Sequence, residues 1–289
     1  MAIPKIKKIS LNEIASYTNW PSRLLSIEPF AVKNKNAFEI NREFGDEKWG
    51  VLLNSFKNDP DLSLSDIEAM EQDLDEMIPC YHQTNGFYLT QAKNAHIQQL
   101  EIYEKILSQY APKAKGLVEL GAGYGSKIIR LSNMASLNQL PLYAADLTES
   151  GSELIGLLAS REKKEIQVGH CDFNTLDVKG LEIPDNSIIF TSYSVHYVPS
   201  LKENFVDFLS QFKPKVVVHF EPCYEFFDSK SLHGLMCKRY MNLNGYTQNI
   251  ASALSSRCEK IGAEFKAQQN VFGTNPFLPI SIVEWIPNK

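Results

Sequence analysis

A glycine-rich segment followed by an acidic residue has the clearest chemical meaning in this sequence. The segment carries glycines at 121, 123 and 125 and stands between an apolar run and an amphipathic stretch. Glycines let the backbone turn tightly after a strand and approach a ligand with no Cβ in the way, and the amides that open the next helix can receive an anion. Asp146 ends the next apolar run, 21 positions after Gly125, where a carboxylate can accept hydrogen bonds from both hydroxyls of a ribose. The combination predicts a site for a ribose-containing cofactor; the alternative is a plain tight turn, with Asp146 only capping a helix at Thr148.

The glycine spacing separates two kinds of cofactor. A dinucleotide fingerprint is G-x-G-x-x-G, in which the third glycine allows close packing of helix on strand. Here the pattern is E-x-G-x-G-x-G, from Glu119 to Gly125, with an acid two positions before the first glycine. This spacing disfavours nicotinamide dinucleotides.

The arrangement resembles motif I of the class I S-adenosylmethionine-dependent methyltransferases, and the resemblance covers roughly residues 92–289. It implies that Glu119 lies near the methionine end of the cofactor and that Asp146 binds the ribose. It also implies that Asp172 holds the adenine amino group and that Phe173 packs against the ring. The cofactor-binding set that the resemblance implies is Glu119, Gly121, Ala122, Gly123, Gly125, Asp146, Leu147, Asp172, Phe173 and Ser192, with S-adenosyl-L-homocysteine as the product.

Candidate catalytic side chains follow the fourth apolar run, in Ser192-Tyr193-Ser194-Val195-His196-Tyr197. Ligands of open α/β sheets bind beyond the carboxyl ends of the strands, so His196 is placed to act as a base near neutral pH. A hydrogen-bonded structural role for this histidine is equally open. Tyr193 frames the pocket or donates a hydrogen bond, with plain core packing as the alternative.

Glu221 ends the fifth apolar run, in His219-Phe220-Glu221-Pro222. An acid that emerges from a buried strand is costly unless it is paired or functional, which favours recognition of an amine or guanidinium substrate. His219 and Glu221 lie on one strand face, but no third ligand is evident, so no metal is expected.

The elements that must position these residues are short apolar runs, each followed by a helical pattern. The runs begin near 116, 142, 166, 187 and 215, and two further runs near 265 and 280 read as a closing hairpin. Such runs alternating with helices predict an α/β fold with an open, doubly wound, mostly parallel sheet. The resemblance implies seven strands. A helix over residues 92–110, with Ile97, Leu100 and Tyr103 on its apolar face, precedes the first run.

Residues 1–91 are expected to form a mainly helical extension that covers the pocket as a lid. Leu64, Ile67, Met70, Leu74 and Met77 recur at helical spacing, and Ser63 or Ser65 can cap that helix. Gly86 is the expected hinge of the lid, with Tyr81 or Tyr88 touching the cofactor. The methyltransferase domain is then 92–289, within which the aromatic-rich segment 222–250 covers the substrate. A role of the extension as the interface of a homodimer stays open.

Composition narrows the class of protein. The chain has 289 residues, 44% hydrophobic and 22% charged, with a net charge of −5 from 29 basic and 34 acidic residues. A nucleic-acid partner is not expected at this charge. The five cysteines form no CxxC pair, and no run approaches the length of a membrane span, so the expected compartment is the cytoplasm.

The expected function is transfer of a methyl group to an oxygen or nitrogen atom of a small molecule, since a covered pocket excludes water and large polymers. Three alternatives stay open: methylation of a protein or RNA, a dehydrogenase, and an inactive cofactor-binding scaffold. Among these, N-methylation of a nucleic-acid base is disfavoured, because TSYSVHY stands where enzymes of that kind carry an N-P-P-Y type tetrapeptide.

Overall fold

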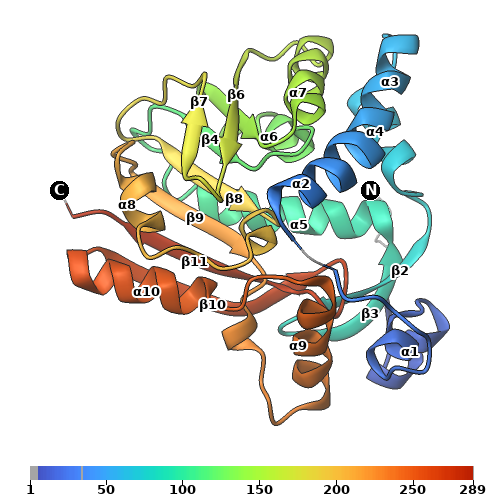
Figure 1. Cartoon of the computed structure of the whole chain (residues 1–289). Helices are drawn as coiled ribbons and strands as arrows, with labels where there is room; N and C mark the ends of the chain where they lie inside the picture. The colour runs from blue at the N-terminus through green and yellow to red at the C-terminus, as the bar shows by residue number, and fades with distance from the viewer. Residues whose placement is uncertain (1–5, 34, 289) are drawn as a thin grey trace.

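One twisted sheet runs through the part of the chain that the computed structural model describes, residues 6–33 and 35–288 (Figure 1). Within these ranges it has eleven strands in the order β1-β3-β2-β10-β11-β9-β8-β4-β5-β6-β7. The strands are β1 (Lys7–Lys8), β2 (Met77–His82), β3 (Gly86–Gln91), β4 (Leu117–Leu120), β5 (Leu142–Asp146), β6 (Ile166–Asp172), β7 (Asp177–Lys179), β8 (Ile188–Ser192), β9 (Val216–Glu221), β10 (Glu264–Gly273) and β11 (Ile280–Ile286).

Helices surround the sheet on both sides. The α-helices are α1 (Trp20–Leu24), α2 (Ala37–Ile40), α3 (Gly50–Asn58), α4 (Leu64–Glu71), α5 (Ala92–Leu107), α6 (Ser126–Leu131), α7 (Glu149–Arg161), α8 (Phe205–Ser210), α9 (Leu232–Asn244) and α10 (Ile250–Ile261). The other helical segments are the 3₁₀ turns η1 (Leu11–Ser16), η3 (Val195–Tyr197) and η4 (Tyr224–Phe226), and the π-helix η2 (Asn41–Trp49). In the described residues, no helix combines the length and apolar character needed to cross a bilayer.

The predicted doubly wound sheet is confirmed in its central strands. β4 pairs in parallel with β5 and β8, and the parallel pairing continues to β6 on one side and β9 on the other. Every residue of β4, β8 and β9 is buried, as the uninterrupted apolar runs require for strands covered on both faces. The last two runs form the expected antiparallel hairpin, in which β11 lies between β9 and β10.

The expectation of seven mostly parallel strands is corrected. The stretch from β6 to β10 supplies seven strands, but β7 extends one edge and β2, β3 and β1 extend the other within the described ranges. All of the added pairings are antiparallel, so the whole sheet is mixed. β1 and β7 are only two and three residues long, and β2 and β3 interrupt their apolar residues with Pro79, Tyr81 and Thr90, so none of the added strands shows the uninterrupted apolar run by which the central strands are recognised.

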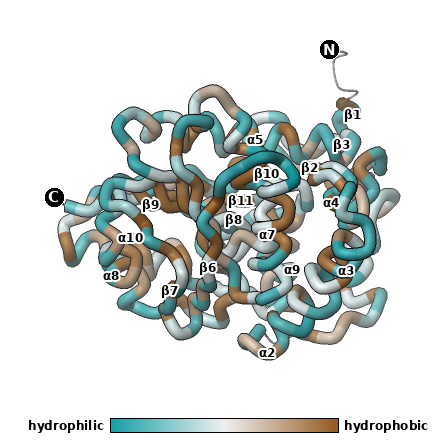
Figure 2. Tube along the Cα trace, turned by 90° about the horizontal axis from the view of Figure 1, so that it is seen from above, coloured by the Kyte–Doolittle hydropathy of each residue, from teal (hydrophilic) through white to brown (hydrophobic). Residues whose placement is uncertain are grey.

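Alternate residues of the central strands point into two separate cores. Leu117, Ile188 and Val216 face one core, which α5, α6 and α7 cover together with α3 and α4. Their sequence neighbours Val118, Ile189 and Val217 face the other core, which α8 and α10 cover. Figure 2 shows the hydrophobic segments gathered in the interior around these strands, with hydrophilic segments on the outer turns.

The N-terminal extension is helical in most of its regular structure, as predicted, but it also joins the sheet. β2 pairs with β10 through His82 and Phe272, so the sheet continues across the expected boundary between residues 91 and 92. The single helix expected from Leu64 to Met77 ends at Glu71, because the chain turns over residues 73–76, where the Leu74 and Glu76 carbonyls accept hydrogen bonds from the start of α5. The cap by Ser63 is confirmed, since its side chain accepts from the Asp66 amide.

Segment 222–250 packs mainly on the N-terminal extension. α9 lies beside α1, and Trp20 contacts Tyr240 with ring centroids 4.3 Å apart. Figure 1 shows α1 and α9 together at one end of the molecule, below β3. These helices enclose a third, smaller core that includes Ile14, Phe227 and Met241.

Candidate functional site

A cavity of about 530 Å³ lies beyond the carboxyl ends of β4, β5, β6 and β8. This is the place where open α/β sheets bind ligands, and the volume is that of a site for small molecules. The cavity brings together ten of the fourteen residues that the sequence singles out: Gly121, Ala122, Gly123, Asp146, Leu147, Asp172, Phe173, Ser192, Tyr193 and His196.

The glycine loop after β4 requires glycine for both its conformation and its surroundings. Gly121 and Gly123 have φ of +74° and +60°, in the left-handed region that side chains disfavour. A Cβ at Gly121 would lie 2.5 Å from the Cβ of Ser194, and one at Gly123 would lie 3.2 Å from the Trp49 ring. The loop is therefore pressed between the turn after β8 and the N-terminal extension.

Asp146 ends β5 and braces this loop. Its Oδ2 accepts from the Gly123 amide at 2.7 Å, and its Oδ1 accepts from the amide and hydroxyl of Thr148 at 2.9 and 2.7 Å. Burial raises the pKa of the Asp146 carboxyl, and the hydrogen bonds from Thr148 and Gly123 offset part of that shift. Three of the roughly four acceptor sites of the carboxylate are therefore occupied, and the one left on Oδ2 can receive a ribose hydroxyl, because the carboxylate lines the cavity.

Glu119 lies beneath the loop, outside the cavity lining. It is fully buried in β4, and its Oε2 accepts from the Ile128 amide at 3.1 Å, while its Oε1 has no hydrogen-bond partner among the described residues. Burial raises the pKa of Glu119 to about 7, against a lowering influence of Lys127. A buried acceptor without a partner is costly, which makes Glu119 a place where a cationic group is favourable.

Replacing Glu119 with Gln is expected to change how stability depends on pH. The folded-state pKa of about 7 exceeds the usual 4.5, so between these pH values the unfolded chain loses this proton while the folded chain keeps it. The free energy of unfolding therefore falls as pH rises from 4.5 toward 7. The loss amounts to about 3 kcal/mol. The amide cannot titrate, so the stability of E119Q relative to the unmodified chain should rise by that amount between pH 4.5 and pH 8. Urea unfolding across this range measures it, with exposed Glu182→Gln as control; a stability difference that stays constant with pH contradicts the expectation.

Asp172 and Phe173 line the cavity where β6 ends. The Asp172 carboxylate is held by Asn174 and Thr175: its Oδ1 accepts from the Asn174 amide at 2.8 Å, and its Oδ2 accepts from the Thr175 hydroxyl at 3.0 Å. The Phe173 ring packs edge-on against Phe205, with centroids 5.6 Å apart. It also lies close to Gly121, where a Cβ would be 3.2 Å from the ring. An acid and an apolar ring side by side suit a planar base with an exocyclic amino group.

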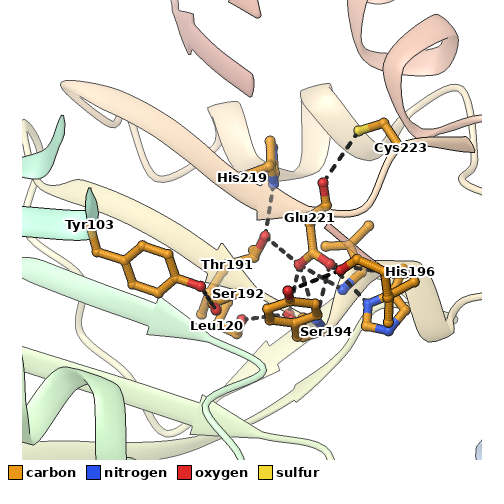
Figure 3. A network of polar contacts seen from close by, with 12 residues as sticks. Tyr103, Leu120, Thr191, Ser192, Ser194, His196, His219, Glu221 and Cys223 are labelled. Atoms are coloured by element: carbon orange, nitrogen blue, oxygen red, sulfur yellow. Dashed lines mark hydrogen bonds and ion pairs between the residues drawn. The ribbon is translucent and has the colours of Figure 1, made fainter. Parts of the chain in front are cut away.

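His196 and Glu221 form a buried pair next to the cavity (Figure 3). His196 Nδ1 lies 3.0 Å from Glu221 Oε2, so the ring donates its Nδ1 proton to the carboxylate and leaves Nε2 as an acceptor. His196 lines the cavity, and its Nε2 is buried with no hydrogen-bond partner in the described chain. An imidazole oriented by a carboxylate, with the opposite nitrogen unpaired, is the arrangement of a general base.

The substrate-recognition role expected for Glu221 is not what its contacts support. Its carboxylate is buried below the turn after β8, where it accepts from the amides of Ser194 and Val195 at 3.0 Å each. Burial alone would raise the pKa of Glu221, but the hydrogen bonds from His196, Ser194 and Val195 together hold it below its usual value. Glu221 is therefore a positioning residue: it fixes the turn that carries His196.

His219 faces the same buried network from β9. Its Nδ1 lies 3.0 Å from the Thr191 hydroxyl, which donates to Glu221 at 2.9 Å, and its Nε2 accepts from the Trp285 indole at 3.2 Å. Burial lowers the pKa of His219 to about 4, so the ring is neutral at pH 7. With both ring nitrogens engaged, His219 has none left for a metal ion, and the described residues contain no group of three or more metal-ligating side chains.

The other predicted residues of the turn after β8 lie in the cavity wall. The Tyr193 hydroxyl donates to the Leu278 carbonyl at 3.1 Å, so the residue presents its ring to the cavity. The Ser192 hydroxyl lies 2.7 Å from the Tyr103 hydroxyl of α5. Tyr88 is elsewhere: it is buried in β3, its hydroxyl donates to Gln98, and it borders a separate surface pocket. Cofactor contact by Tyr88 is not supported, because β3 lies toward the far edge of the sheet.

The part of the extension that covers the cavity runs from residue 40 to 72, rather than through the hairpin around Gly86. Its lining residues are Ile40, Phe44, Lys48, Trp49, Glu68, Glu71 and Gln72. Sequence reasoning missed Phe44 and Trp49, which stand in a polar stretch that shows no strand or strong amphipathic pattern. Segment 222–250 covers His196 from outside through Tyr246, at 4.5 Å between ring centroids, but stays outside the lining.

Helix α5 contributes His96, Gln99 and Leu100 to the same cavity. Gln99 is only 8% exposed, and its side-chain Nε2 has no partner among residues 6–33 and 35–288. A buried amide donor facing a cavity is suited to an anionic or carbonyl group of a ligand. The sequence held a signal for it, since Gln99 stands beside Leu100 on the helix face that carries Tyr103. The side chain of Ile97 is 54% exposed, so its predicted position on the apolar face of this helix is wrong.

Known proteins offer structural but no sequence matches. The sequence matches no protein-family model and no curated protein. Among solved structures, a magnesium protoporphyrin IX methyltransferase from Synechocystis with bound S-adenosylhomocysteine has 13% identity and a TM-score of 0.48, covering 68% of this chain and 87% of that one. An O-methyltransferase from Bacillus cereus, also with S-adenosylhomocysteine, has 12% identity and a TM-score of 0.41, covering 66% and 81%. A small RNA methyltransferase has 13% identity and a TM-score of 0.48, covering 70% and 28%.

Proposed function

We propose that this protein is an S-adenosylmethionine-dependent methyltransferase that methylates an oxygen or nitrogen atom of a small molecule. The observation that carries the proposal is the junction of Asp146 with the glycine loop. The carboxylate holds the Gly123 amide at 2.7 Å and faces the cavity, as a ribose-binding acid must.

The side chains present fit the rest of the cofactor. Asp172 and Phe173 suit the adenine. The methionine part carries a carboxylate, which suits Gln99 Nε2, an unpartnered donor of the cavity lining. The bound cofactor would supply a methyl group on a sulfonium, which is a good leaving group. The protein has then to align the acceptor behind that methyl group and exclude water.

Two features favour a small acceptor with a proton to lose. His196 Nε2 is buried and unpartnered among the described residues, so it takes that proton when the acceptor reaches it, and Glu221 keeps the ring in the required orientation. The covering segment from Ile40 to Gln72 walls the cavity on the side of the extension, which favours a compact acceptor over a polymer.

Two measurements test the proposal. Calorimetric titration should show binding of S-adenosylhomocysteine and none of NAD; tight NAD binding with no response to S-adenosylhomocysteine overturns it. Labelled S-adenosylmethionine, supplied with the pure protein and an extract of its source cells, should transfer label to the small-molecule fraction. Label found in protein or RNA instead overturns the small-acceptor part alone.

A further inference from the structure

Six aromatic rings form a continuous band along one wall of the cavity, between the proposed base His196 and the glycine loop. All six residues line the cavity, and the band runs from the turn after β8, through the covering segment, to the glycine loop. The band consists of Tyr193, His196, Tyr197, Phe44, Trp49 and Tyr124.

Each ring of the band touches the next. His196 lies 4.2 Å from Tyr197, and Tyr197 lies 4.9 Å from Phe44, between ring centroids. Phe44 is 5.6 Å from Trp49, which is 4.9 Å from Tyr124 and lies over Gly123. The band therefore runs from the proposed base to the glycine loop of the proposed cofactor site. An acceptor must lie between these two places, because it loses its proton at one and receives the methyl group at the other.

The three tyrosines of the band contact the cavity with their rings, because their hydroxyls are hydrogen-bonded to other residues. Tyr193 donates to the Leu278 carbonyl, Tyr124 donates to Glu71, and Tyr197 is hydrogen-bonded to Tyr246. With these hydroxyls engaged, the band lacks the multiple polar groups that a sugar or other polyol acceptor needs. Flat apolar faces instead favour stacked or edge-on contacts with another aromatic ring.

One lysine places a positive charge on the band inside the cavity. The Lys48 ammonium lines the cavity, lies 4.4 Å from the Phe44 centroid and makes no ion pair in the described ranges. Lys35, 4.9 Å from the Tyr197 centroid, is paired with Glu43 and lies outside the lining. At the Phe44 face, Lys48 repels a further cation and stabilises an oxygen that becomes anionic.

We infer that the acceptor is a planar aromatic compound whose ring hydroxyl is methylated, an inference that rests on the proposed function. The acceptor ring lies along the band, and its hydroxyl faces His196 Nε2. The hydroxyl proton moves to Nε2, and the phenolic oxygen forms a bond to the methyl carbon. The carbon–sulfur bond breaks and sulfur keeps its electron pair, giving an aryl methyl ether and S-adenosylhomocysteine. The imidazolium then releases its proton to water, so no further reactant is needed.

Binding and turnover together test this inference. In the presence of S-adenosylhomocysteine, calorimetric titration with catechol, caffeate and quercetin is compared with titration by cyclohexanediol, quinate and phenethylamine. At least one of the aromatic hydroxyl compounds should bind and accept labelled methyl groups, and the saturated and amine counterparts should not. Label on an aliphatic alcohol or an amine in preference to the aromatic hydroxyls overturns the inference, as does the absence of binding by every aromatic hydroxyl compound.

A matched pair of variants assigns the effect to the band. Phe44→Leu removes one ring from the band but keeps an apolar side chain, and should weaken binding of the aromatic acceptor about three- to ten-fold. Phe38→Leu changes an exposed ring outside the cavity and should leave it unaltered. Equal affinity in F44L and the parent chain overturns the stacking role. Binding of S-adenosylhomocysteine alone is measured in parallel: its absence refutes the proposed function, whereas its presence with a failed aromatic panel refutes only the acceptor class.

Discussion

The His196→Asn variant is expected to lose about 100- to 10,000-fold in turnover while it still binds S-adenosylhomocysteine. Asparagine can donate its side-chain N–H to Glu221 in place of Nδ1, which preserves the buried hydrogen bond of 3.0 Å. It has no counterpart of Nε2, so only the acceptor for the substrate proton disappears. Initial rates with labelled S-adenosylmethionine measure the loss, and calorimetry measures cofactor binding.

The control for this variant is His82→Asn. His82 lies in the β2–β3 hairpin, where its Nδ1 accepts from the Thr84 amide at 3.1 Å, and asparagine is well tolerated in such turns. Turnover of H82N should equal that of the parent chain. If H196N keeps full turnover, His196 is a structural residue and the alignment of the acceptor is sufficient for catalysis.

The Asp146→Ala variant is expected to bind S-adenosylhomocysteine at least about 100-fold more weakly, because hydrogen bonds to a charged group contribute about 1.5–3 kcal/mol each. The substitution removes the proposed acceptor for the ribose and also releases the Gly123 amide, held at 2.7 Å. Calorimetric titration measures the affinity, and thermal unfolding shows whether the variant is folded.

Two further variants keep this result interpretable. Asp146→Asn retains one carbonyl oxygen for the loop and should lie between alanine and the parent chain in affinity. Asp185→Ala removes an exposed acid that pairs with Lys213 at 3.0 Å and should bind normally. Unchanged binding by folded D146A excludes Asp146 from the ribose site.

The sequence identifies the part of the site that local pattern determines. Asp146 and the glycine loop follow buried strands, and the carboxyl ends of neighbouring parallel strands must meet, so their proximity follows from the strand pattern alone. His196 is found in the same way. The structure adds which nitrogen of its ring is free, because that depends on Glu221 reaching the turn from the next strand.

The rest of the site depends on tertiary packing that local pattern does not encode. Trp49 reaches the glycine loop through a π-helix, a rare geometry that no simple periodicity marks. Tyr88 is predicted at the cofactor only if the segment before α5 folds over the site, but that segment pairs with β10 and extends the sheet. The cost of a buried acid predicts Glu221 at the substrate, but buried amide and imidazole donors satisfy its carboxylate equally well.

The position of Trp49 has a thermodynamic consequence. Its ring covers Gly123 on one side and touches Phe44 on the other, so one side chain borders both the cofactor half and the acceptor half of the cavity. A ligand that displaces or supports this ring from either half changes the surface that the second ligand meets. The two affinities are then linked, and by reciprocity the factor by which the first ligand tightens the second equals the factor by which the second tightens the first.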